Sequence, residues 1–149
     1  PLVSRLLDYA SAKGIKTVVV MEGIDQPGAE EPKILGVGST NASRDILKKY
    51  DIDEMKEGMV SGISGVMLFE GDMRDIDVIC LLGPARANFP DARGSAKLLE
   101  VIAKMLPEIK IDPEPLFKEA EEIEKQIRMA MQSVEQQKKP TIEESIVYG

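Results

Sequence analysis

A chain of 149 residues with a hydrophobic fraction of 43% is long enough to form one domain with a sizeable core. Its formal net charge of −7 argues against a nucleic-acid partner, because nucleic acid selects basic surfaces. No apolar stretch approaches the roughly 18 residues of a membrane span and no signal peptide is visible, so we expect no membrane partner.

The amino-acid composition excludes several classes of catalytic site. The chain has no His, so it can form neither a Ser–His nor a Cys–His pair, nor a zinc site that uses His. Cys80 is the one cysteine, and its apolar neighbours predict a buried side chain in a reducing, cytoplasmic compartment. The charged set is dominated by Lys and Glu, which favours a thermophilic source. We expect a protein that is not an enzyme and has no cofactor.

The first half of the chain predicts helix, strand, strand and helix. The first helix follows an apolar period from Leu2 and ends near Gly14. Residues 16–21 form a β-branched run typical of a strand buried on both faces, and residues 33–39 predict a second, short strand. Thr40 or its neighbour Asn41 caps a helix that runs to about residue 50.

The second half begins with an acidic connection over residues 51–60 and a loop that enters a helix within residues 61–73. Residues 78–82 predict a third strand, closed by a Gly-Pro pair. A helix over about residues 91–106 follows, and three prolines between residues 107 and 115 indicate a spacer.

The last long element is an amphipathic helix over about residues 116–136. Its apolar residues recur three or four positions apart: Leu116, Ala120, Ile123, Ile127, Met131 and Val134. Such a seam needs a surface to pack on. The sequence leaves open whether that surface is the body of the same subunit or a neighbouring subunit.

These elements predict an α/β fold with three parts. Residues 1–112 form the α/β core, residues 113–136 the amphipathic helix, and residues 137–149 a flexible tail. Three strands are few for an independent sheet, and the chain starts at Pro1 rather than Met. We therefore expect residues 1–112 to be the C-terminal part of a longer domain with further strands upstream.

The glycines at positions 36 and 38 occupy a sequence position where a nucleotide-binding loop could occur. The GVG segment at residues 36–38 follows a predicted strand and precedes a predicted helix. A dinucleotide fingerprint would need Gly at position 41, where the chain has Asn41, so tight-turn geometry is the simpler interpretation. The GISG segment at residues 62–65 continues with Val66, whereas a nucleophile elbow needs Gly there.

The chain ends with Val147, Tyr148 and Gly149, which resemble the hydrophobic–tyrosine–any-residue C-terminal signature of proteasome activators. A terminal carboxylate on a flexible chain can pair with a Lys in a receptor pocket. Tyr148 supplies a rigid aromatic body with a polar tip, and Val147 an apolar contact. The signature therefore predicts a docking tail, although by itself it is short.

Three segments of the body resemble the archaeal proteasome assembly chaperone family in their order and spacing. They are GISGVML at residues 62–68, VICLLG at residues 78–83 and FPDAR at residues 89–93. The resemblance covers roughly residues 1–135. Family members normally carry an upstream segment with a Gly-rich stretch, which is absent here.

The resemblance implies a Rossmann-like three-layer α/β body with a mainly parallel sheet. It implies a homo-oligomer that acts without ATP, as an assembly chaperone or as an activator of the proteasome. Its partner would be the α-ring of the core particle, contacted by Val147, Tyr148 and Gly149. Two alternatives remain: an oligomeric scaffold for another client with an idle tail, and a nucleotide-binding enzyme that uses residues 36–38.

Overall fold

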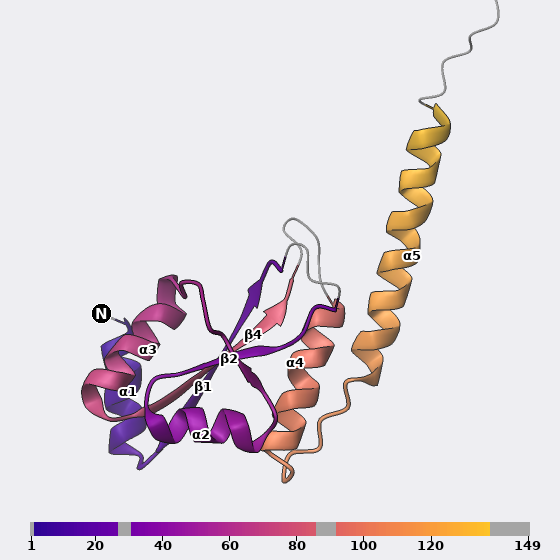
Figure 1. Ribbon diagram of the computed structural model, residues 1–149. Coiled ribbons are helices and arrows are strands. Elements are labelled where there is room, and N and C mark those ends of the chain that lie inside the picture. Colours follow the sequence, from indigo (N-terminus) through magenta and orange to yellow (C-terminus); the bar gives the residue numbers. More distant parts are fainter. Residues whose placement is uncertain (1, 27–30, 86–91, 138–149) are drawn as a thin grey trace, which may run out of the picture.

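The computed structural model describes residues 2–26, 31–85 and 92–137, and Figure 1 shows their arrangement. The elements, in chain order, are α1 (Leu2–Ala12), β1 (Thr17–Ile24), β2 (Leu35–Gly38), α2 (Asn41–Lys49), β3 (Asp53–Glu54), α3 (Gly62–Arg74), β4 (Asp77–Pro84), α4 (Ala92–Met105) and α5 (Glu114–Gln137). The predicted α/β class is confirmed.

The strands of the described residues form one mixed sheet in the order β1-β4-β2-β3. β1 and β4 run parallel over eight residues, from the Thr17–Asp77 pair to the Ile24–Pro84 pair. β2 lies antiparallel to β4, and the two residues of β3 lie parallel to β2. Two of the three strand pairs are therefore parallel, as expected for a mainly parallel sheet.

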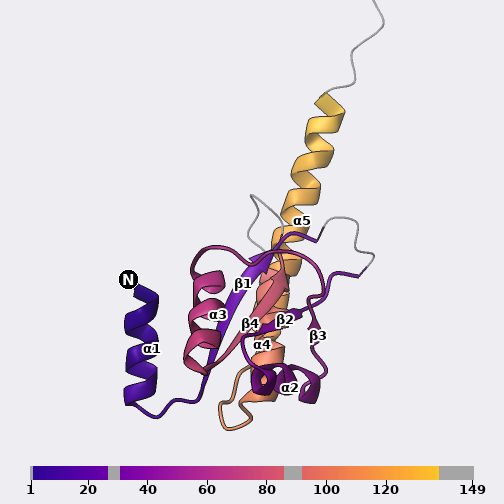
Figure 2. The same cartoon turned by 60° about the vertical axis from the view of Figure 1, so that its left-hand side comes forward.

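Helices cover both faces of the sheet and give the predicted three layers (Figure 2). On one face, α1 and α3 pack over Val78 of β4, with Leu7 and Met67 in the same cluster. On the other face, Ile79 and Leu81 lie in a cluster with Leu47 of α2, and α4 packs against it. Successive β4 residues thus pack against helices on opposite faces of the sheet. Because both faces are buried, the sequence of this strand is a continuous apolar run.

The helix α2 begins where a capping box fixes the chain. The Ser43 amide donates to the Thr40 hydroxyl over 3.0 Å, and the Thr40 amide donates to the Ser43 hydroxyl over 2.8 Å. These two bonds satisfy backbone donors that have no partner within the first helical turn. The predicted cap at Thr40 is confirmed.

The start of α3 depends on a glycine with no room for a side chain. A Cβ atom at Gly65 would lie 2.4 Å from the carbonyl oxygen of Val60. In an open helical site, Gly→Ala would stabilise the helix by about 1 kcal/mol. Here the backbone contact reverses the sign, and we expect Gly65→Ala to lower the free energy of unfolding by about 1–3 kcal/mol.

Urea unfolding followed by circular dichroism measures this change. Asp72→Ala, at an exposed site on the same helix, is the control and should shift the midpoint little. A Gly65→Ala protein more stable than the parent would contradict the packing described for the start of α3.

The helix α5 starts two residues earlier than the sequence predicts. Pro115 lies in its first turn, where the amide hydrogen that proline lacks would have no partner in the helix. The Glu114 amide donates to the Asp112 carboxylate over 3.1 Å. The predicted proline-containing spacer is therefore shorter than expected.

Within the ranges that the structure describes, no helix is both long and apolar enough to cross a membrane.

Candidate functional site

The first half of α5 packs against α4. Ala120 is 3% exposed, and Leu116, Ile123 and Ile127 are half-buried. An ion pair adds to this contact. Arg93 at the start of α4 donates from Nε to Glu124 Oε1 over 3.0 Å and from Nη2 to Oε2 over 3.2 Å. The predicted seam is thus confirmed for its first four residues, with the same subunit as the surface.

The second half of α5 leaves the body of the molecule, as both views show (Figures 1 and 2). Met129 and Met131 are more than half exposed, at 51% and 58%. A helix of 24 residues is about 36 Å long at roughly 1.5 Å per residue. The end of α5 at Gln137 therefore lies well away from the sheet, and the seam at Met131 has no covering element among the described residues.

The attachment of α5 can be tested with one substitution. We expect Ala120→Glu to detach the helix from α4, because a carboxylate would replace a methyl group in an apolar contact with no partner charge introduced. Amide hydrogen exchange across residues 114–127 should then rise by about tenfold or more, which corresponds to roughly 1.4 kcal/mol.

Ala130→Glu is the matched control, because it makes the same change on the exposed half of the same helix. It should leave exchange across residues 114–127 unchanged. Equal effects of the two substitutions would mean that α5 is not held by its contact with α4.

The glycines at residues 36–38 serve helix packing. A Cβ atom at Gly36 would lie 2.4 Å from Cδ2 of Leu47, and one at Gly38 would lie 2.6 Å from the Ser43 hydroxyl. Both glycines lie in β2 and neither has a positive φ, so the tight turn predicted for this pair is wrong. They instead let α2 approach β2 closely.

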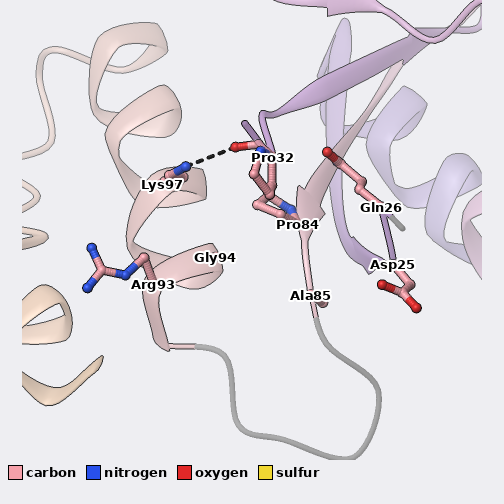
Figure 3. A pocket seen from close by; sticks show the side chains of 8 residues that line it. All are labelled: Asp25, Gln26, Pro32, Pro84, Ala85, Arg93, Gly94 and Lys97. Atoms are coloured by element: carbon pink, nitrogen blue, oxygen red, sulfur yellow. Dashed lines mark hydrogen bonds between the residues drawn. The ribbon is translucent and has the colours of Figure 1, made fainter. Parts of the chain in front are cut away.

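A pocket of about 370 Å³ lies at the carboxyl ends of β1 and β4 (Figure 3). Ligands of open α/β sheets bind at this position, so it is the natural place for a small molecule. However, the Lys97 ammonium donates to the Pro32 carbonyl oxygen over 2.9 Å, and Arg93 points away from Pro84 and Ala85 towards its ion pair with Glu124. Among the described residues that line this pocket, the two cationic side chains are therefore already engaged.

Cys80 has the inert environment that its neighbours predict. It is fully buried in β4, and burial raises the pKa of its thiol to about 11, with a further contribution from the charge of Glu22. The thiol therefore stays protonated near neutral pH and is a poor nucleophile.

Ser64 of the GISG segment is also buried, 7% exposed, in the first turn of α3. In the described part of the chain, no cluster of three acidic or sulfur ligands could hold a metal ion.

A family model described as the PAC2 family matches residues 1–131, most of the chain. This chain belongs to the PAC2 family. The expected likeness to archaeal proteasome assembly chaperones is confirmed by a crystal structure of Pyrococcus furiosus PbaA, titled an archaeal homologue of proteasome-assembly chaperone. The match has a TM-score of 0.79 at 27% identity and covers 91% of this chain and 57% of PbaA.

Two further comparisons describe the same PAC2 body. Pyrococcus furiosus PbaB, titled an archaeal proteasome activator, matches with a TM-score of 0.73 at 23% identity over 87% of this chain and 57% of that one, and it shows the fold alone. An uncharacterized protein of Methanocaldococcus jannaschii (MJ0106) is 34% identical over 127 residues, 85% of this chain and 52% of that protein. The PAC2 chain thus spans about half the length of the curated relatives that it matches.

The predicted docking residues Val147, Tyr148 and Gly149 lie outside the described residues. Their role therefore stays a prediction. The sequence interpretation missed an apolar groove along the outer edge of β1. The available signal was the recurrence of large apolar residues on α1 at Leu2, Leu6 and Tyr9, four and three positions apart.

Proposed function

We propose that this PAC2 chain is a non-catalytic, homo-oligomeric, cytoplasmic protein that acts on the proteasome, as an assembly chaperone or as an ATP-independent activator. In this proposal residues 137–149 are a flexible tail, and Val147, Tyr148 and Gly149 enter pockets between α subunits of the core particle. The observation that supports it most is the projection of α5, whose second half carries the chain away from the α/β body (Figure 1).

The arrangement of the body and α5 suits a tether that carries the last residues of the chain to a distant pocket. The body and the first half of α5 form a fixed base through Ala120 and the Arg93–Glu124 ion pair. The exposed half of α5 then acts as a spacer of roughly 15–20 Å at about 1.5 Å per residue. A flexible segment of ten residues adds on the order of 17 Å. Together these lengths would let the last three residues enter a pocket while the body stays outside.

The chemistry of the last three residues fits a receptor pocket that contains a cation. In this proposal Gly149 carries a free α-carboxylate, an anion that a Lys or a group of backbone amides can bind. Tyr148 adds a large contact area at little cost in conformational entropy, since its side chain has few rotatable bonds. One such tail binds weakly, but several tails on one oligomer gain from effective concentrations of about mM. Self-association is therefore part of the proposal.

Membership of the PAC2 family supports a proposed role at the proteasome. PbaA, the relative at 27% identity, is described as a homologue of a proteasome-assembly chaperone. An ATP-independent mechanism agrees with the use of the glycines at residues 36–38 for helix packing. Chaperone and activator remain joined in the proposal because both would use the same tail contact.

The test is to mix the intact protein with an archaeal 20S core particle and with its isolated α subunits. Light scattering after size-exclusion chromatography gives the mass of the protein alone and of each complex. We expect an oligomer that comigrates with the core particle. Faster hydrolysis of a fluorogenic peptide would identify an activator, and faster formation of α-rings a chaperone. An intact protein that binds neither would overturn the proposal and leave a scaffold for another client.

A further inference from the structure

The direction in which α5 leaves the body depends on a short zone of contact. Among the described elements, α4 is its main support. Ala120 is the most deeply buried of the described α5 side chains, at 3% exposed, and it contributes a single methyl group. Apolar packing between helices allows the crossing angle to vary by about 15–20°. These contacts therefore hold α5 against α4 but fix its tilt only loosely.

Arg93 and Glu124 add a directional contact on the same side of α5. Glu124 follows Ala120 by four residues, so the two side chains lie one above the other on the helix. Arg93 donates to both carboxylate oxygens of Glu124, over 3.0 Å and 3.2 Å. Two parallel bonds between planar groups fix orientation as well as distance. The helix thus has an apolar support at Ala120 and an oriented support about one turn later.

The α4 side of this contact is rigid. In the first turns of α4, Gly94 and Ala96 are buried. One turn further on, Leu98 packs so closely on β4 that a Cβ atom at Gly83 would lie 2.7 Å from its Cδ1 atom. The backbone that carries Arg93 is therefore held to the sheet, and its side chain can serve as a fixed reference for α5.

The length of α5 beyond this contact amplifies any change of tilt (Figure 1). From Ala120 to Gln137 the helix extends roughly 25 Å at about 1.5 Å per residue. A tilt of about 15–20° at Ala120 would move the end of the helix by roughly 7–9 Å. An oriented contact at Glu124 is placed where it can prevent that movement.

We propose that Arg93 is a positioning residue: its two bonds to Glu124 set the direction of α5 and thereby the place where the proposed tail is presented. The second half of this inference rests on the proposed function, because presentation matters only if the tail docks. The pair acts by geometry more than by net attraction, since an ion pair with side chains 42% and 28% exposed adds little to stability. Loss of the pair should therefore change the direction of α5 without unfolding the chain.

The distance between two spin labels measures the direction of α5. The labels are attached at Asp72→Cys on α3 and Gln132→Cys on α5, both exposed positions, in chains diluted with unlabelled protein. Cys80 is buried in β4 and is left in place. We expect Arg93→Gln to widen the distribution of distances by roughly 5–6 Å, the displacement that the same tilt gives at position 132.

Matched variants separate the ion pair from a general effect of charge. Lys97→Gln removes another α4 cation, whose ammonium bonds to the Pro32 carbonyl oxygen, and should leave the distribution unchanged. Arg93→Lys keeps the charge but not the planar fork, so its distribution should be wider than that of the parent. Arg93→Glu should widen it further, and adding Glu124→Arg should restore most of the narrow distribution. A role of either residue in folding alone would not give this rescue.

Binding to the core particle tests the second half of the inference. Arg93→Gln should weaken binding by about tenfold, because tails that point in many directions are presented at a lower effective concentration. The exchanged pair, with Glu at position 93 and Arg at position 124, should restore binding. Biolayer interferometry measures both effects, and circular dichroism verifies the folding of every variant.

Three results would overturn the inference. The first is an unchanged distribution of distances in Arg93→Gln. The second is an exchanged pair whose distribution stays as wide as that of Arg93→Glu. The third is full binding of Arg93→Gln to the core particle despite a wider distribution, since direction would then not govern presentation.

Failure of the proposed function has a different result. An intact protein that binds no core particle would refute the docking role, and the distances between the labels would still decide whether Arg93 sets the direction of α5.

Discussion

Deleting Val147, Tyr148 and Gly149 is expected to weaken binding of the oligomer to the proteasome core particle by at least about 30-fold. Removal of an aromatic anchor from a desolvated pocket costs roughly 2 kcal/mol or more, and the loss is multiplied when several tails bind together. The deletion leaves the described body and α5 untouched, since these residues lie beyond Gln137. Biolayer interferometry on immobilised core particle measures the effect.

Two controls separate the tail contact from general surface effects. Adding two glycines after Gly149 keeps Tyr148 but displaces the carboxylate, and it should weaken binding to a similar extent. Tyr9→Ala removes another exposed tyrosine, on α1, and should leave binding to the core particle unchanged. Undiminished binding of the truncated protein would mean that another surface makes the contact.

Replacing Leu81 by Ala is expected to lower the free energy of unfolding by about 2–5 kcal/mol. Leu81 is fully buried in β4 and packs in the cluster that joins the sheet to α2 and α4. β4 lies between β1 and β2, so the surrounding side chains are held from both sides and cannot easily close the cavity left behind. Urea unfolding, followed by far-ultraviolet circular dichroism, gives the change from the shift in midpoint.

Leu106→Ala is the control, because it removes the same atoms from a side chain that is 41% exposed beyond the end of α4. Its midpoint should move by much less than that of Leu81→Ala. If the two variants lose equal stability, the cluster around Leu81 is not the core of this layer.

The body of this PAC2 chain could be predicted in good part from its sequence, since the apolar residues of its long elements repeat regularly. The β4 run and the amphipathic period of α5 both appear in the structure close to where the pattern places them. β3 was missed inside the predicted acidic connection. A pair as short as Asp53 and Glu54 has no period to detect, and it is a strand only because β2 lies beside it.

The surface of the groove was harder to predict because it depends on tertiary contacts. The sequence shows that Leu2, Leu6 and Tyr9 share one side of a helix. It does not show that the polar side of α1 is taken by α3, or that β1 ends the sheet. For the predicted docking tail, the sequence is the more informative source. It singles out Tyr148, whereas the residues around Tyr148 lie outside the described part of the structure. The boundary at residue 112 also stays a prediction.

Photo-crosslinking from position 148 tests the central claim most directly. A benzoylphenylalanine in place of Tyr148 keeps an aromatic ring at the site of the proposed contact. After irradiation with the core particle, the account predicts crosslinks to α subunits at the junction between two neighbours. Crosslinks confined to this chain, with none to any α subunit, would contradict it.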